Sequence, residues 1–289
     1  MTHRTVRTRL LPALLALMLL QGCETLGSVV PWTGKSEDLR PRADPAARTV
    51  EELYNNGVDA LNQRRYATAV QQFDAVEQNY PYSSWAVNAQ LMHGYAEYLQ
   101  NRYTEAIGAL DRFIQLHPTN ANASYAYYLR GLSFYEQIAD IQRDQKGTEQ
   151  AMVALQDVVN RFPESAYARD ARLKIDLCRD HLAGKEMEIG RYYERQKLYA
   201  ASIGRFQKVV DEYQTTNHAP EALHRLTEIY LLLGLTDQAK RTAAVLGHNY
   251  PGSPWYEDSY GQLAQNGIAP PTAEASRPGF FARTLGSVF

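Results

Sequence analysis

The sequence predicts an all-α protein built from five similar helical hairpins. A small residue is followed four positions later by a large apolar residue and eight positions after that by proline, as in Ala69, Phe73 and Pro81. An aromatic residue or threonine stands three positions before each small residue, and a glycine or threonine stands twelve positions before four of them. The spacing recurs at Ala106, Leu110, Pro118; at Ala151, Leu155, Pro163; at Ala239, Ala243, Pro251; and, in degenerate form, at Ser202, Phe206, Gln214.

Each copy of this pattern predicts two packed helices joined by a turn. The small residue lets the two helices approach closely, and the large residue one turn later fills the space between them. Proline ends the second helix because it cannot continue the hydrogen-bond ladder. One hairpin cannot bury its own apolar face, so hairpins stack. The pattern is typical of the tetratricopeptide repeat and predicts a right-handed α-solenoid, with Phe73, Leu110, Leu155 and Phe206 buried and about ten helices.

Residues 1–22 are interpreted as a lipoprotein signal peptide. Three arginines precede an apolar stretch of eleven residues, which is too short to span a bilayer comfortably. The stretch ends in Leu20-Gln21-Gly22-Cys23, which resembles a bacterial lipobox and predicts acylation of Cys23. The alternative is an ordinary secretory signal with an incidental cysteine. Glu24 stands where an aspartate would signal retention in the inner membrane, which favours the outer membrane.

The rest of the chain divides into three predicted parts. Residues 23–48 are rich in proline, glycine and charge and are interpreted as a flexible tether after the lipidated cysteine. Residues 49–265 hold the five repeats, starting at Thr49 as an N-cap. Residues 266–289 are interpreted as a disordered, proline-rich tail whose apolar end is either a short linear motif or a frayed terminus.

Two interruptions break the repeat rhythm. Eight extra residues around 140–147 predict a charged loop that projects between the helices of the third repeat. A further fourteen extra residues before Gly190 predict a long helix over 166–196, with a possible break near Gly184.

No catalytic constellation or cofactor motif is found, and the chain is predicted not to be an enzyme. The histidines after the signal peptide are scattered, none pair with each other at helical ligand spacing, and no metal site is predicted. Cys178 and His181 share a helical face, but no third group accompanies them. A buried, inert thiol in an apolar row with Leu173 and Leu177 is therefore expected for Cys178. The net charge of −2 gives no basic excess for nucleic acid.

A peptide-binding face is predicted from the tyrosines of the first helices of the repeats. The chain has 20 tyrosines but 8 phenylalanines, and a tyrosine combines a large contact area with a polar tip. Tyr95, Tyr98, Tyr125 and Tyr128 are the candidate contacts for extended clients, although each could instead belong to the repeat core. The lysine–asparagine clamp that co-chaperones of this repeat class use for terminal carboxylates is absent.

The lipobox, the repeats and their interruptions together resemble the BamD family, the outer-membrane lipoproteins of the β-barrel assembly (BAM) machine. The resemblance is carried by the stretches Asp111-Arg112-Phe113-Ile114-Gln115-Leu116-His117-Pro118-Thr119, Tyr128-Leu129-Arg130-Gly131-Leu132, Asp180-His181-Leu182-Ala183 and Tyr192-Tyr193-Glu194-Arg195. It covers about residues 49–262. The departures are a longer proline-rich tail and Gln214 in place of a proline.

This resemblance implies a lipid-anchored scaffold on the periplasmic face of the outer membrane. The amino-terminal repeats would receive unfolded outer-membrane proteins, and the carboxy-terminal repeats would hold the POTRA domains of the barrel subunit BamA. Arg205 corresponds to a family arginine that pairs with a POTRA carboxylate; the alternative is local pairing with Asp211 or Glu194. Gly204 beside it suggests close approach of another backbone. The alternative function is that of another periplasmic repeat lipoprotein, in envelope or polysaccharide assembly.

Overall fold

The computed structural model describes residues 48–268, and every regular element among them is an α-helix. By internal contacts the chain divides into Met1–Asp44 and Pro45–Phe289, and the described residues belong to the second unit. Its helices are α1 (Val50–Asn62), α2 (Tyr66–Asn79), α3 (Ser84–Leu99), α4 (Tyr103–Leu116), α5 (Ala123–Tyr135), α6 (Lys146–Arg161), α7 (Ala166–Arg195), α8 (Tyr199–Glu212), α9 (Ala219–Leu232), α10 (Thr236–Asn249) and α11 (Pro254–Gln265).

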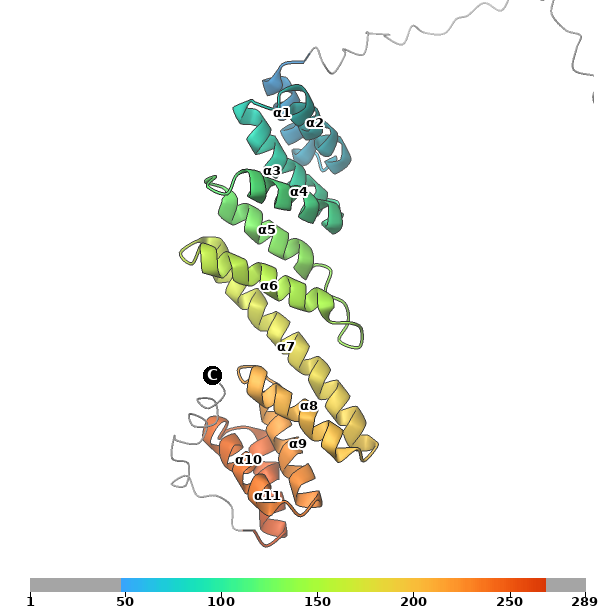
Figure 1. Cartoon of the computed structure of the whole chain (residues 1–289), viewed down its shortest axis with the longest axis vertical. Coiled ribbons are helices and arrows are strands. Elements are labelled where there is room, and N and C mark those ends of the chain that lie inside the picture. Colours follow the sequence, from blue (N-terminus) through green and yellow to red (C-terminus); the bar gives the residue numbers. More distant parts are fainter. Residues whose placement is uncertain (1–47, 269–289) are drawn as a thin grey trace, which may run out of the picture. The chain divides into compact units, whose positions relative to one another are not determined.

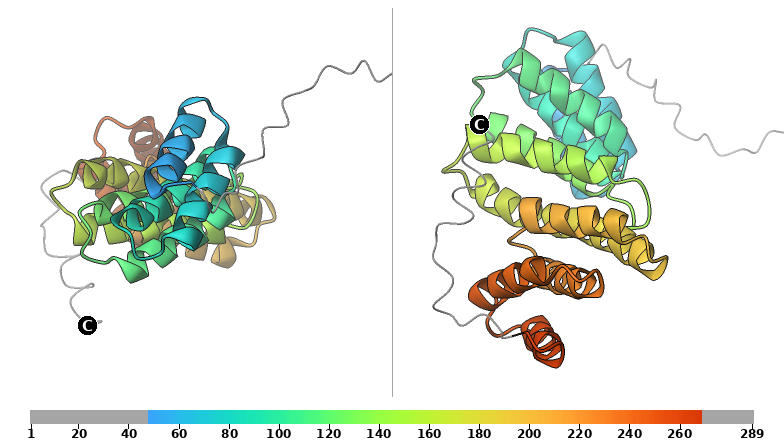
Figure 2. Two further views of the ribbon diagram at one scale, coloured as in Figure 1. Left: turned by 90° about the horizontal axis from the view of Figure 1, so that it is seen from above. Right: turned by 60° about the horizontal axis from the view of Figure 1, so that its bottom comes forward.

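The helices pack on one another in chain order, from α1 to α10 (Figure 1). Helices α1/α2, α3/α4, α5/α6, α7/α8 and α9/α10 are the five predicted hairpins, and α11 packs on α9 and α10 after the fifth (Figure 2). The structure therefore confirms the all-α repeat fold, with one helix more than the ten expected. Thr49 caps α1 as predicted: its side chain accepts a hydrogen bond from the Glu52 amide, and the Glu52 carboxylate accepts one from the Thr49 amide.

In each of the first four hairpins a large side chain of the second helix fills the space over a glycine of the first helix. Phe73, Leu110, Leu155 and Phe206 are all fully buried, as predicted. A Cβ atom on the facing Gly57, Gly94, Gly131 or Gly190 would lie 2.5–2.9 Å from these side chains. In the fifth hairpin the large residue is replaced by Ala243, and the glycine by Thr227, which is also fully buried. In the fifth hairpin the first helix thus carries the larger side chain and the second helix the smaller one, the reverse of the other four hairpins.

Each second helix ends at an aromatic or histidine residue in the same backbone conformation. Four of these C-cap residues precede a proline, as in Tyr80-Pro81, where φ is −135° and ψ is 52°. The fifth, Tyr213, precedes Gln214 and still adopts φ −126° and ψ 38°. The loss of the proline at position 214 therefore leaves the end of α8 unchanged.

The long helix α7 spans 30 residues without the break considered near Gly184. A Cβ atom at Gly184 would lie 2.3 Å from Ile141 Cδ1 and 3.1 Å from His218 Nε2. A larger residue at position 184 would therefore clash with the two loops that pack on α7 here. The glycine does not interrupt the helix, which continues on both sides of it. Its first half packs on α6 and its second half on α8 (Figure 1).

The insertion of the third repeat is packed against α7, which corrects the expectation that it projects. Ile141 reaches Gly184, and Lys185 Nζ donates a hydrogen bond to the Gln142 carbonyl over 2.9 Å. Gln145 is buried and donates to the carbonyls of Asp140 and Arg143. Lys146 and Gly147, which were expected in the loop, form the first turn of α6. These contacts satisfy three backbone carbonyls of the loop and hold it on α7.

Candidate functional site

Tyrosines of three successive first helices form one cluster, which we call the tyrosine cluster: Tyr95 and Tyr98 on α3, Tyr125 and Tyr128 on α5, and Tyr167 on α7. Tyr98 belongs to it because it packs on the same buried residues as Tyr95 and Tyr125. Ring centroids lie 6.3 Å apart for Tyr95–Tyr125, 5.4 Å for Tyr125–Tyr167 and 5.2 Å for Tyr128–Tyr167. All five side chains are partly exposed. The structure therefore brings together the four tyrosines singled out from the sequence and adds Tyr167, which the repeat pattern did not indicate.

The phenol groups of the cluster are hydrogen-bond donors. Tyr128 donates to Asp170, and Tyr98 donates to Glu136 over 3.4 Å. Burial, followed by the charge of Glu136, raises the pKa of Tyr98 to about 12. Burial also raises the pKa of Tyr125 and, together with the hydrogen bond to Asp170, that of Tyr128. All three phenols remain protonated at neutral pH and offer polar edges beside apolar ring faces.

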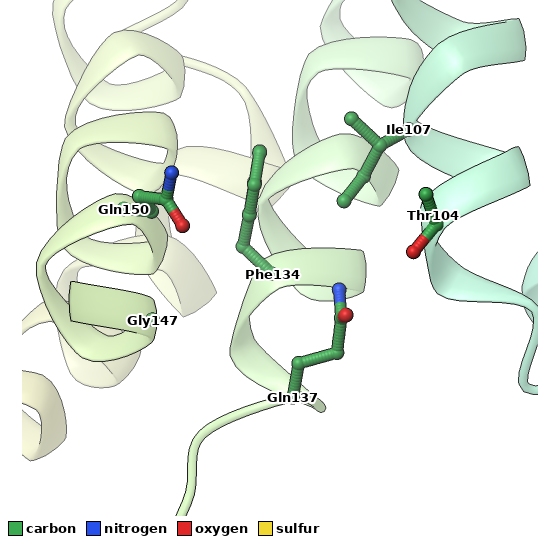
Figure 3. Close-up of a pocket in the computed structure, with 6 residues that line it drawn as sticks. All are labelled: Thr104, Ile107, Phe134, Gln137, Gly147 and Gln150. Atoms are coloured by element: carbon green, nitrogen blue, oxygen red, sulfur yellow. The ribbon is translucent and has the colours of Figure 1, made fainter. Parts of the chain in front are cut away.

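A pocket of about 340 Å³ lies between α4, α5 and α6. Five of its six lining residues lie on α4, α5 and α6, and the sixth, Gln137, follows the end of α5. The six are Thr104, Ile107, Phe134, Gln137, Gly147 and Gln150. Figure 3 shows the Phe134 ring between Ile107 and Gln150, with Gln137 below it. The apolar floor can receive one side chain, and the amides can bind a peptide backbone. Thr104 and Gln137 directly follow Tyr103 and Glu136, the contacts of Tyr98.

Arg205 on α8 is held by a carboxylate that the sequence did not indicate. Its Nη1 atom lies 2.9 Å from Glu186 Oε2 on α7, and Lys208 Nζ lies 2.8 Å from the other oxygen of Glu186. The local ion pair of Arg205 is therefore with Glu186 and not, as the alternative from the sequence had it, with Asp211 or Glu194. The side chains of Arg205 and Lys208 are each 40% exposed, so both cations can still reach a partner.

Gly204 lies on the open side of α8. None of the described side chains or backbone comes within 4 Å of a Cβ atom built on it. Its expected close contact with another backbone is therefore not made within residues 48–268. Ala201, Gly204 and Gln207 are all exposed on α8 beside Arg205. Because Gly204 has no side chain and Ala201 a small one, we call this part of α8 the low surface.

Cys178 is fully buried, and burial raises the pKa of its thiol to about 11. It packs with Ile175 and Ala171 against Leu155, so the buried thiol is confirmed. Leu173 and Leu177 are not its neighbours in the core, because their side chains are 63% and 57% exposed. The buried positions of α7 follow the helical period through 171, 175, 178 and 182, which turns 173 and 177 to solvent.

The structure also brings together charged side chains that sequence spacing did not relate. His93 and Glu97 on α3 face Asp74 and Glu77 on α2, although the sequence analysis predicted no metal site. Spacing within one helix could not indicate this group, because its members lie on two different helices. Cys23, the predicted signal peptide, nearly all of the predicted tether and most of the predicted tail lie outside the described residues. Within residues 48–268, none of the helices combines the length and apolarity needed to cross a membrane.

Comparison with known proteins connects this arrangement to one family. The family model described as YfiO, outer membrane lipoprotein, matches residues 46–246. The outer membrane protein assembly factor BamD of Caulobacter vibrioides is 51% identical over 243 residues, which cover 84% of this chain and 79% of the relative. BamD of Rickettsia prowazekii is 42% identical over 260 residues, covering 90% and 98%. BamD of Neisseria meningitidis serogroup A is 35% identical over 246 residues, covering 82% and 89%. The chain therefore belongs to the YfiO family of outer membrane lipoproteins, which confirms the resemblance to BamD.

Proposed function

We propose that this chain is a scaffold for the assembly of outer-membrane proteins, which holds BamA in the BAM complex and receives unfolded clients. Family membership supports assembly at the outer membrane. The partners are inferred from the family resemblance and from two surfaces: the tyrosine cluster for clients, and the face around Arg205 for a POTRA domain. The other candidate function, scaffolding of envelope or polysaccharide assembly, has no feature of the described residues that favours it.

The tyrosine cluster is the observation on which the client-binding proposal depends. Its partly exposed rings extend over three helices. The pocket between α4, α5 and α6, which none of these five tyrosines lines, adds apolar side chains and amides. An unfolded segment of an outer-membrane protein presents alternating apolar side chains and unpaired backbone amides. The ring faces of the cluster can pack on the apolar side chains of such a segment. The phenol groups, together with the amides of Gln137 and Gln150, can form hydrogen bonds with its backbone.

Binding of fluorescent fragments that tile an unfolded outer-membrane protein tests this site. Tyr95→Ala and Tyr98→Ala should weaken binding roughly five- to tenfold, because each removes an aromatic contact of about 1 kcal/mol. Tyr82→Ala is the matched control, since Tyr82 is fully exposed in the turn between α2 and α3. Equal affinities for all three variants would exclude the cluster as the client site.

The face around Arg205 is proposed to bind a POTRA domain of BamA. Arg205 and Lys208 present two cations beside the low surface at Gly204, and a planar guanidinium can pair with a carboxylate through two hydrogen bonds. Glu186 fixes the direction of both side chains. A POTRA carboxylate would share Arg205 with Glu186.

Co-purification of BamA separates the proposed contact from the local ion pair. Arg205→Gln should reduce recovery of BamA, and Arg205→Glu should reduce it further because a carboxylate would face the POTRA carboxylate. Glu186→Gln keeps Arg205 and is the control for loss of the local pair. A compensating acid-to-arginine change in the POTRA domain should restore binding to Arg205→Glu. Undiminished recovery with Arg205→Glu would remove Arg205 from the interface.

Anchoring through an acylated Cys23 on the periplasmic face is part of the same proposal. Several acyl chains hold a protein on a membrane stably, whereas one binds only marginally. Cys23→Ser should leave the precursor uncleaved by the lipoprotein peptidase and release the protein from outer-membrane fractions. Normal processing of Cys23→Ser would show that the cysteine is incidental.

The scaffold is proposed to act without catalysis. Cys178, the strongest nucleophile candidate, is buried with a thiol pKa of about 11, so almost no thiolate exists at neutral pH. Substrate turnover that is lost in Cys178→Ala would contradict this part of the proposal.

A further inference from the structure

Four ionisable side chains converge between the first and second repeats. Asp74 and Glu77 lie one turn apart on α2, and His93 and Glu97 lie one turn apart on α3. His93 Nδ1 lies 2.8 Å from Asp74 Oδ1 and 3.7 Å from Glu77 Oε1, and His93 Nε2 lies 3.6 Å from Glu97 Oε1. The imidazole thus stands between two carboxylates on one side and a third on the other.

Several polar atoms of this group are buried without a hydrogen bond. Glu77 Oε1, His93 Nδ1 and Glu97 Oε2 have no hydrogen-bond partner, although each is shielded from solvent. Asp74 is close to His93 Nδ1 but not in line with it, so the 2.8 Å approach is not a hydrogen bond. Glu97 is only 4% exposed. Glu97 Oε2 lies 3.4 Å from Arg102 Nη1 and is served by that ion pair. The other two atoms, Glu77 Oε1 and His93 Nδ1, lie 3.7 Å apart, and an ion bound between them would satisfy both.

The charges of the group identify such an ion as a cation. Three carboxylates surround one imidazole, and the nearest cations are Arg102, 3.4 Å from Glu97, and Arg112, 3.9 Å from Glu77. Both distances are longer than a charge-assisted hydrogen bond, in which nitrogen and oxygen lie about 2.7–2.9 Å apart. Both arginines are about half exposed, at 50% and 52%, and can turn to solvent.

We propose that Asp74, Glu77 and His93 bind one divalent first-row transition metal ion, with Glu97 orienting the imidazole. One ligand atom of each lies within 4.8 Å of the other two. Ligands of an ion bound at about 2.1 Å lie about 3.4 Å apart. The 2.8 Å from His93 Nδ1 to Asp74 and the 3.7 Å to Glu77 lie on either side of this spacing, so only small side-chain movements are needed. Asp74, which is 41% exposed, has the freedom to make such a movement.

The role of Glu97 follows from the two nitrogens of His93. A metal-binding histidine usually donates its other N–H to a carboxylate, which fixes the tautomer and raises ligand basicity. Here Nε2 faces the buried Glu97, which leaves Nδ1 free to face Asp74 and Glu77. A mixed nitrogen and oxygen ligand set suits Zn²⁺, Co²⁺ or Mn²⁺. The bound ion would tie α2 of repeat one to α3 of repeat two.

Titration of the full chain with Co²⁺, followed by visible absorption and competition with Zn²⁺, tests the site. One Co²⁺ should bind per chain and be displaced by Zn²⁺. The near-isosteric variants Glu77→Gln and His93→Gln should bind at least tenfold more weakly. The control is Asp180→Asn, at the exposed pair where His218 Nε2 lies 3.8 Å from Asp180, and it should bind as the unchanged chain does.

Two further measurements test the site, and the first is made on the unchanged chain alone. Mn²⁺ should broaden the ring resonances of His93 before those of His117, which is bonded to Gln90 instead. Zn²⁺ should raise the melting temperature of the unchanged chain and of Asp180→Asn but not of Glu77→Gln. Two results would each overturn the proposal: no Co²⁺ or Zn²⁺ bound at 100-fold excess, or equal affinity in Glu77→Gln. The group would then be an ion-pair cluster around an imidazolium.

Discussion

A Cβ atom on Gly190 of α7 would lie 2.5 Å from Phe206 Cε1 on α8. The ring fills the space that the missing side chain leaves, and Ser202 one turn earlier donates a hydrogen bond to the Gly190 carbonyl over 2.9 Å. The two helices are therefore held together at the glycine by packing and by one buried hydrogen bond.

Gly190→Ala should destabilise the protein by about 1–3 kcal/mol, because the new methyl group overlaps a fully buried ring. The free energy of unfolding from urea titration measures the effect. Phe206→Leu in the same chain should recover part of the loss, since a smaller side chain makes room. A Gly190→Ala protein as stable as the unchanged chain would show that α7 and α8 can separate freely.

Gly204→Ala should instead stabilise the isolated chain by roughly 0.5–1 kcal/mol, since alanine is the better helix former and the position is open. The same urea titration gives the comparison with Gly190→Ala. If a partner backbone approaches Gly204, this more stable variant should bind BamA more weakly. Unchanged binding would place the partner elsewhere on α8.

Phe73→Ala should cost about 3–5 kcal/mol, because Phe73 is fully buried over Gly57 and its removal leaves a cavity. Thermal unfolding followed by circular dichroism measures it. Leu173→Ala is the control, since that side chain is 63% exposed and should cost less than about 0.5 kcal/mol. A similar small loss for both variants would contradict the assigned core.

Glu186→Gln should destabilise the protein by roughly 1–3 kcal/mol at neutral pH, between values typical of exposed and buried pairs. Burial alone would raise the pKa of Glu186, but hydrogen bonds from Lys208 and Arg205 outweigh it and lower the pKa. A lowered pKa contributes stability above the unfolded-state pKa, and this contribution is lost as the pH falls through the folded-state value.

The stability difference between the unchanged chain and Glu186→Gln should therefore be full at neutral pH and disappear in acid. Unfolding titrations at a series of pH values down to the acid limit of the fold measure it. A difference that does not change with pH would mean that the ion pairs to Glu186 do not stabilise the folded state.

Cys178 should react with a thiol reagent only when the chain unfolds. The side chain is fully buried and its pKa is raised to about 11, so both access and thiolate formation are limited. Labelling by iodoacetamide should be at least 100-fold slower in the native state than in urea. Fast labelling of the native protein would show that α7 opens near Cys178.

The sequence by itself determined the repeat fold and its core. The four-residue step between small and large residues places Phe73, Leu110, Leu155 and Phe206 on one helical face, and all four are buried. The N-cap at Thr49 and the end of the second helices before the prolines likewise follow from local chemistry. The sequence also singled out four tyrosines that the structure places in one cluster.

Only the tertiary structure decided which side chains meet across helices. Glu186 as the partner of Arg205, Tyr167 in the tyrosine cluster, and His93 facing Asp74 and Glu77 were not predicted. The helical period shows which face of a helix is buried, but not which residue of the neighbouring helix lies opposite it. That depends on the crossing angle and the stagger of the two helices, which packing of the whole array sets.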